Sequence, residues 1–240
     1  MEKRKAASSA GTLRPWREGL WRFALPSTER VVIGVTDRTC HLDELRQRLP
    51  GMSGLILAEQ VHGASVAAAS HPQPGDRPVP GCDGLTTRTA AMALAIRTAD
   101  CLPIACWDPV RRAVGLVHAG WRGLAGWLPM RLVTFMRQVY HSRPPDLRIA
   151  IGPAIRACCY EVSDDFLPRF APFMRREGGR WHYDLVASAV DQLTTVGVRS
   201  SRILDAGACT ACDTARWHSF RREGESNLRL FSFAMIQSHE

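Results

Sequence analysis

Two histidines and one cysteine are the side chains in this sequence best suited to metal binding or catalysis: His62, Cys101 and His118. Each lies in a turn-like segment at the end of an apolar run, where rigid scaffolds usually present reactive groups. Two imidazoles and a thiolate can hold Zn²⁺ and leave a fourth tetrahedral position open, as catalytic zinc sites do. The same ligands also suit copper. The residue types therefore predict a metal centre and leave zinc and copper both open.

A metal-free alternative uses the same residues. Cys101 would be a nucleophile and His118 its base, with Asp100 or Glu161 orienting the imidazole, as in a cysteine hydrolase or transferase. The spacing does not decide between these readings, because Cys101 lies 39 residues after His62 and 17 before His118, and neither interval is a local metal signature. A zinc nucleobase deaminase is disfavoured, since His118 is not followed by the His-x-Glu pattern of those enzymes.

The sequence contains eight cysteines in 240 residues. A chain that is neither small nor visibly secreted favours free thiols, metal ligands or catalysis over disulfides. Cys209 and Cys212 form a C-x-x-C pair without a thioredoxin-like context, and a zinc knuckle would need a second such pair. Cys158 and Cys159 are adjacent, so we expect at most one of them to face any site. We interpret Cys209 and Cys212 as structural thiols.

The net charge of +8 comes almost entirely from arginines spread along the chain. There is no block of like charges and no aromatic-basic repeat, so the pattern predicts no nucleic-acid partner and favours a solvated surface or an anionic small substrate. No apolar run reaches the ~18 residues that suggest a membrane span. The basic N-terminus lacks the apolar region of a secretory signal. We therefore expect a cytoplasmic protein.

The elements that must position these side chains are strands and helices without strict alternation. Apolar and β-branched runs predict strands at 31–36, 92–98, 103–107, 113–118, 147–151, 202–204 and 230–236. Helical periodicity predicts helices at 41–49, 121–141 and 183–196, with Pro129 either kinking the second or starting its second part. The three middle strands should be buried on both faces. This mixture predicts an α+β fold with a mixed sheet. Residues 1–25 read as a loosely ordered polar leader and 26–240 as one catalytic domain.

Several motifs resemble one family in their order along the chain. They are 60–63 (QVHG), 83–87 (DGLTT), 98–103 (TADCLP), 118–125 (HAGWRGLA), 151–153 (IGP), 159–162 (CYEV), 184–185 (DL), 209–210 (CT) and 219–222 (SFRR). The sequence is similar to the laccase-domain family, also called multicopper polyphenol oxidases or YfiH-like proteins. The resemblance covers residue 54 to the C-terminus.

This resemblance implies a single layered domain with mixed sheets flanked by helices, similar to certain cysteine-hydrolase toxins. It also implies a metal centre formed by His62, Cys101 and His118, usually with zinc and with copper as an alternative. The activities attributed to the family are phosphorolysis of purine nucleosides (adenosine, inosine, guanosine and methylthioadenosine) with some adenosine deamination, polyphenol oxidation, and amide hydrolysis that edits a nucleotide-linked peptidoglycan precursor.

The chain departs from the family pattern in three places. Gly-Gly-Val-Ser and Ser-Leu-Asn-Leu-Gly segments are missing after residues 36–38, a Gly-Pro-Cys-Ile motif reads 152–155 (GPAI), and a late Gly-Arg reads 228–229 (LR). The metal triad is intact. We therefore expect a remodelled N-terminal wall of the pocket.

The leading hypothesis is a zinc-dependent purine nucleoside phosphorylase, as a monomer or homodimer. Arg122, Arg221 and Arg229 are candidates for binding phosphate, because the guanidinium fork matches its oxygens. Tyr160 is a candidate for stacking on the substrate or hydrogen bonding to it. Asp100 and Glu161 are candidates for moving protons or for holding His62 and His118. The alternatives are the amidase, a copper oxidase, and a protein that binds a nucleotide without turnover.

Overall fold

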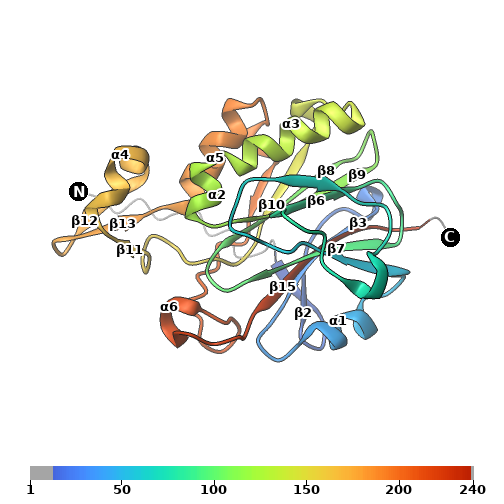
Figure 1. Ribbon diagram of the computed structural model, residues 1–240, viewed down its shortest axis with the longest axis horizontal. Helices are drawn as coiled ribbons and strands as arrows, with labels where there is room; N and C mark the ends of the chain where they lie inside the picture. Colours follow the sequence, from blue (N-terminus) through green and yellow to red (C-terminus); the bar gives the residue numbers. More distant parts are fainter. Residues whose placement is uncertain (1–12, 239–240) are drawn as a thin grey trace.

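Two six-stranded β-sheets lie at the centre of the molecule, as the computed structural model of residues 13–238 shows (Figure 1). The first sheet has the strand order β1-β2-β3-β15-β7-β4 and the second has β14-β10-β8-β9-β6-β5. Both are mixed, because β4 runs parallel to β7, and β10 runs parallel to β14, among otherwise mostly antiparallel pairs. Apolar side chains of both sheets, among them Ile56, Leu94, Trp107 and Leu116, form a common core between them.

The strands of the first sheet are β1 (Leu13–Arg17), β2 (Leu20–Phe23), β3 (Val31–Thr36), β4 (Gly54–Leu57), β7 (Met92–Thr98) and β15 (Leu230–Ile236). Those of the second are β5 (Val66–Ala68), β6 (Gly84–Thr87), β8 (Leu102–Asp108), β9 (Ala113–Ala119), β10 (Arg148–Ile151) and β14 (Ile203–Asp205). Nearly every side chain of β7, β8 and β9 is buried. This confirms the prediction that these three strands are covered on both faces.

Helices cover the outer face of each sheet (Figure 1). The short α1 (Leu42–Arg48) packs Leu45 on the outer face of the first sheet. On the second sheet lie α2 (Trp121–Ala125), α3 (Leu128–Tyr140) and α5 (Leu185–Thr195). The predicted helix at 121–141 is divided at Trp127, whose φ is 62°, and Pro129 lies in the first turn of α3. Pro129 therefore starts a new helix, as proline at that position favours.

The prediction of a loosely ordered leader at 1–25 is wrong for residues 13–23, which the structure describes. Residues 13–23 form the hairpin β1–β2, which extends the first sheet, and the rest of the expected leader up to residue 12 lies outside the described residues. Gly19, with φ of 69°, makes the turn, and Leu20 and Phe23 are buried. The hairpin was missed because β1 (LRPWR) is an edge strand with two arginines and a proline, which a buried strand would not carry.

A third, three-stranded sheet extends to one side of the body with the short α4 (Leu167–Phe170) beside it (Figure 1). It consists of β11 (Glu161–Val162), β12 (Met174–Glu177) and β13 (Arg180–Tyr183). The last helix, α6 (Phe220–Glu223), lies in the long connection between β14 and β15. These elements were not predicted, because they are short and their side chains are mostly polar.

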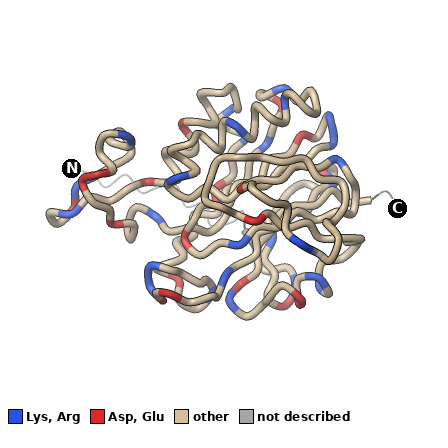
Figure 2. Tube along the Cα trace, viewed as in Figure 1, with Lys and Arg blue, Asp and Glu red and all other residues tan. Residues whose placement is uncertain are grey.

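Charged residues are distributed along the whole fold, with basic and acidic residues interspersed (Figure 2). This agrees with the even spread of arginine along the sequence. Among the helices of residues 13–238, none is long and apolar enough to cross a bilayer.

Candidate metal centre

His62, Cys101 and His118 come from three separate segments and meet at one end of the two sheets. His62 lies in the loop after β4, Cys101 in the turn from β7 to β8, and His118 near the end of β9. Their ligand atoms all lie within 4.8 Å of one another. The two imidazole rings stand edge to face, with centroids 4.9 Å apart. His118 is buried, Cys101 is half-buried and His62 is exposed, so the group is rigid on one side and reachable from the other.

The buried Asp83 organises the two histidines. Its Oδ1 accepts a hydrogen bond from the backbone N–H of His62 at 2.9 Å and lies 3.0 Å from Nδ1 of His118. Its Oδ2 accepts from the backbone N–H of Gly63 at 2.7 Å. Because a carboxylate only accepts, Nδ1 of His118 carries the proton and Nε2 is left for a metal. Sequence reasoning assigned this task to Asp100 or Glu161 and missed Asp83, although 83–87 (DGLTT) was among the family motifs.

The pKa values of Cys101, His118 and Asp83 depend on one another. Burial raises the pKa of Cys101, but hydrogen bonds with His118 and His62 outweigh it and lower that pKa to about 7. Burial lowers the pKa of His118, whereas Asp83 and Cys101 raise it to about 9 overall. Burial likewise raises the pKa of Asp83, and the hydrogen bond from His118 brings it below its usual value. A Cys101 thiolate beside a protonated His118 imidazole is therefore favoured in the metal-free protein.

The backbone at the site is strained, and the atoms around it are tightly packed. His62 and Asp100 have φ of 59° and 87°, values that residues with a Cβ seldom adopt and that cluster at functional sites. A Cβ on Gly120 would lie 2.9 Å from the Cys101 sulfur. The absence of a side chain at Gly120 therefore allows Cys101 to approach the end of β9 closely.

Asp100, next to Cys101, binds the C-terminal segment and not the histidines. Its Oδ1 accepts from the Thr210 hydroxyl at 2.5 Å, and its Oδ2 accepts from the Ser219 hydroxyl at 3.1 Å and the Arg221 backbone N–H at 2.7 Å. All these contacts span more than a hundred residues of sequence. The carboxylate is thus a buried anchor for the residues 210–221 around Cys101.

Tyr160 and Arg221 lie beside this anchor. The Arg221 guanidinium lies 5.4 Å from the centre of the Tyr160 ring and donates to the Glu161 carbonyl at 2.9 Å. Burial and the neighbouring Cys101 raise the pKa of Tyr160 to about 12, against the charges of Arg221 and Arg122. The carboxylate of Glu161 faces away in an exposed ion pair with Arg180 at 2.8 Å. The structure therefore brings Tyr160 and Arg221 towards Cys101 and engages Glu161 through its backbone.

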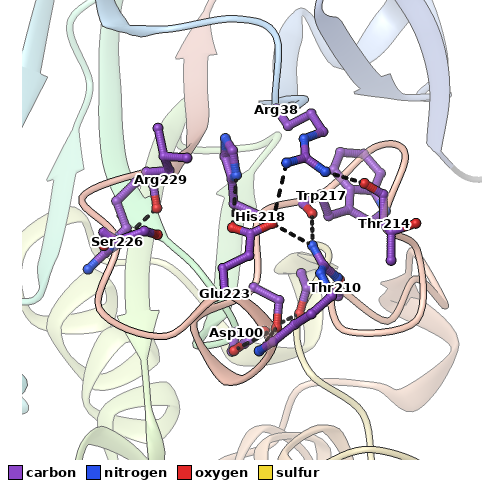
Figure 3. A network of polar contacts seen from close by, with 12 residues as sticks. Arg38, Asp100, Thr210, Thr214, Trp217, His218, Glu223, Ser226 and Arg229 are labelled. Carbon is purple, nitrogen blue, oxygen red and sulfur yellow. Dashed lines mark hydrogen bonds and ion pairs between the residues drawn. The ribbon is translucent and has the colours of Figure 1, made fainter.

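The other two predicted arginines are placed differently from each other. Arg122, on α2, is exposed and lies 4.5 Å above the ring of Trp121, and its charge acts on Tyr160. Arg229 donates to the carbonyls of Ser226 and Leu228 in its own loop (Figure 3). Arg122 therefore lies near Tyr160, whereas Arg229 supports the loop that leads into β15.

A second polar network, centred on Glu223, holds the same C-terminal segment (Figure 3). Glu223 accepts from Arg222 at 2.8 Å and Arg38 at 3.4 Å, and lies 3.2 Å from Nδ1 of His218. Arg222 also donates to the carbonyls of Thr210, Ala211 and Trp217. Arg38, next to the position of the missing family motifs, is therefore joined to the C-terminal segment by its ion pair with Glu223.

The side chains of His62, Cys101 and His118 are chemically suited to bind a metal ion. Two imidazole nitrogens and one thiol of lowered pKa converge, and one imidazole is oriented by a carboxylate, as metal-binding histidines usually are. Three protein donors with one exposed side suit zinc in a catalytic arrangement, and the His₂Cys set also suits copper.

Purine nucleoside phosphorylases and an adenosine deaminase are among the known proteins with similar sequences. A purine nucleoside phosphorylase, YlmD, from Geobacillus stearothermophilus is 37% identical over 193 residues, which cover 74% of this chain and 70% of that protein. A purine nucleoside phosphorylase from Xylella fastidiosa (strain Temecula1) is 35% identical over 80% of this chain and 77% of its own length. An adenosine deaminase, RL5, from an unknown prokaryotic organism is 29% identical over 75% of this chain and 74% of its own length.

Solved structures show the same fold. The crystal structure of YlmD from Geobacillus stearothermophilus superposes with a TM-score of 0.84 and 30% identity, over 95% of this chain and all of that one. The Bacillus licheniformis hypothetical protein YfiH gives the same TM-score at 23% identity, over 94% of this chain and 99% of that one. The family described as multi-copper polyphenol oxidoreductase laccase matches residues 31–237. The chain is a member of this laccase-like, YfiH-type family.

Proposed function

We propose that this protein is a zinc-dependent enzyme that cleaves purine nucleosides with inorganic phosphate. The observation that carries the proposal is the convergence of His62, Cys101 and His118 within 4.8 Å, with Asp83 orienting His118. The relatives named purine nucleoside phosphorylase support the substrate class. A zinc ion held by these three residues would supply Lewis-acid activation of the substrate.

Phosphate would bind between Arg122 and Arg221. Both charges act on Tyr160, and Arg221 is fixed through its backbone by Asp100 and through its guanidinium by the Glu161 carbonyl. A phosphate oxygen attacks C1′ of the ribose while the bond from C1′ to the purine nitrogen breaks. The electron pair of the broken bond stays on the purine nitrogen, the purine takes up the proton that phosphate gives up, and ribose 1-phosphate remains. The guanidinium groups hold the attacking anion in place and so lower the cost of orientation.

Tyr160 would contact the substrate as a hydrogen-bond donor. Because its pKa is raised to about 12, chiefly by burial, the phenol keeps its proton at neutral pH. Asp100 already accepts three hydrogen bonds, so we assign it a positioning role for Arg221 and Thr210. Glu161 supports Arg221 through its carbonyl.

Adenosine deamination is a second candidate activity, because the relative RL5 is named an adenosine deaminase. Deamination replaces the amino group of adenine with oxygen from water and needs no phosphate. It would therefore persist in phosphate-free buffer, where phosphorolysis stops.

The test begins with protein purified without added metal, in which zinc and copper are quantified. Inosine and adenosine are then incubated with and without phosphate, and ribose 1-phosphate, free base and inosine are measured. Wild-type protein and the matched variant Cys40→Ala, a buried cysteine beside α1, should contain zinc and form ribose 1-phosphate only with phosphate. Cys101→Ala should lose the phosphate-dependent product and should contain less zinc per chain than wild type. Protein without zinc, or zinc-loaded protein without a phosphate-dependent product, would refute the proposal.

A further inference from the structure

Four cysteine sulfurs gather outside the His62–Cys101–His118 centre. Cys158 and Cys159 come from the turn after β10, and Cys209 and Cys212 from the loop after β14. The Cys158 sulfur lies 3.7 Å from each of the other three sulfurs, and those of Cys159 and Cys212 are 3.3 Å apart. All four lie within 4.8 Å of one another, and all four thiols are free.

These separations match a tetrahedral thiolate site. With zinc–sulfur bonds of about 2.3 Å, the sulfurs of a regular tetrahedron stand ~3.8 Å apart. A disulfide would need about 2.05 Å. The cluster therefore has the dimensions of a metal cage with four ligands, and its sulfurs are too far apart for disulfides.

Contacts that do not involve the sulfurs hold the two loops together. Ala154 and Cys209 form an isolated parallel bridge, and the Thr210 backbone N–H donates to the Ala154 carbonyl at 3.0 Å. Arg156 makes a two-point ion pair with Asp205, at 2.8 and 2.6 Å, and also donates to the Ala208 carbonyl. Backbone hydrogen bonds and the Arg156–Asp205 ion pair thus bring the two cysteine pairs together before any ion binds.

The expectation that only one of two adjacent cysteines could face a site is wrong here. The Arg156 carbonyl accepts from the backbone N–H groups of both Cys159 and Tyr160, which closes a tight turn. In this turn both sulfurs approach Cys212. The second pair that a zinc knuckle requires is therefore supplied by neighbours in sequence, which the spacing alone could not reveal.

We propose that Cys158, Cys159, Cys209 and Cys212 bind a structural zinc ion that clamps these two loops. Four thiolates fill the tetrahedral positions and leave none open for chemistry, as in structural zinc sites. One loop continues into Tyr160, and the other carries Thr210, which binds Asp100 beside Cys101. The ion would therefore fix two walls of the neighbouring site without contacting its substrate.

The test uses a background in which the first centre is disabled, Cys101→Ser with His118→Ala, so that its outcome does not depend on the proposed activity. Zinc is quantified per chain in this protein, in the same protein with Cys212→Ser, and in a control with Cys40→Ser. We expect about one equivalent of zinc in the background and the control, and loss of at least tenfold with Cys212→Ser. Replacement by cobalt should give the intense visible absorption of a tetrahedral thiolate site.

Cys212→His serves as the conservative variant, since a Cys₃His set also binds zinc. It should retain the ion if Cys212→Ser loses it through a missing ligand, and fail to do so if that loss reflects misfolding. The proposal would be overturned if the background protein contained no zinc, or if its zinc content were unchanged by Cys212→Ser. It would also be overturned if the cobalt–thiolate bands were absent, or if mass spectrometry found a Cys159–Cys212 disulfide.

Discussion

Nδ1 of His118 lies 3.0 Å from Oδ1 of Asp83, and both side chains are buried. This contact fixes which imidazole nitrogen faces Cys101. The same carboxylate also holds the backbone of His62 and Gly63, so one residue positions two of the three donors.

Replacing the Asp83 carboxylate should weaken metal binding. Asp83→Asn removes a charged acceptor behind His118 and places an amide donor against the N–H groups it formerly satisfied. Loss of such a partner typically lowers metal affinity about 10–100-fold. Competition with a chromogenic chelator measures this change. Asp108→Asn is the matched control, because Asp108 is also buried and accepts two backbone N–H groups at the other end of β8. Equal affinity in Asp83→Asn and wild type would contradict the assigned role.

Gly120→Ala should displace the Cys101 thiol. The added Cβ would lie 2.9 Å from the sulfur, closer than packed atoms tolerate. We expect metal affinity to fall at least tenfold while the fold persists, as circular dichroism and metal titration would show. Gly51→Ala is the control. Its φ of 70° is strained for alanine, at a cost of about 1–2 kcal/mol, but no atom lies within 4 Å of its added Cβ. Normal metal binding by Gly120→Ala would rule out this packing argument.

Metal affinity should rise with pH. Binding requires deprotonated Cys101 and a free Nε2 on His118, whose metal-free pKa values are about 7 and about 9. Protons therefore compete with the metal most strongly at low pH, and affinity should increase steadily until pH approaches 9. Calorimetry in buffers of different ionisation enthalpy should detect proton release. Binding without proton release near neutral pH would contradict the coupling.

The stability of the metal-free protein should show the opposite trend for His118. Its pKa is raised on folding, so its contribution is fully present below the unfolded value near 6.5 and is lost as pH rises through about 9. Denaturant unfolding of metal-free protein across this range measures the effect, with His118→Gln as the comparison. If the free energy of unfolding varied with pH in the same way in wild type and His118→Gln, the pKa of His118 would not be raised on folding.

Arg221 should matter for phosphate more than for the nucleoside. Arg221→Met removes a charge-assisted hydrogen bond worth about 1.5–3 kcal/mol, so the KM for phosphate should rise roughly 10–100-fold. Arg221→Lys should recover part of this loss. Arg137→Met, an exposed site on α3, provides the matched loss of charge. A change confined to the KM for inosine would assign Arg221 to a different subsite.

The three candidate metal donors that the sequence predicts do meet in the structure, but the carboxylate that orients His118 was not predicted. His62, Cys101 and His118 stand out because each is a reactive side chain beside small residues at the end of an apolar run. Asp83 gives no such signal, since its role depends on β6 lying next to β9.

The apolar or charged character of each strand decided whether it could be predicted from the sequence. Continuous apolar runs mark β7, β8 and β9, whereas β1, β12 and β13 expose charged side chains and resemble loops. The four-cysteine cluster also depends on tertiary contacts, through the pairing of Arg156 with Asp205.

The central claim is that the metal held by His62, Cys101 and His118 is required for phosphate-dependent cleavage. The most direct measurement is ribose 1-phosphate formation from inosine by protein stripped with a chelator and then titrated with zinc. We expect the stripped protein to be inactive, and zinc to restore activity in wild type and Cys40→Ala but not in Cys101→Ala. Full activity after stripping, or equal recovery in Cys101→Ala, would contradict the account.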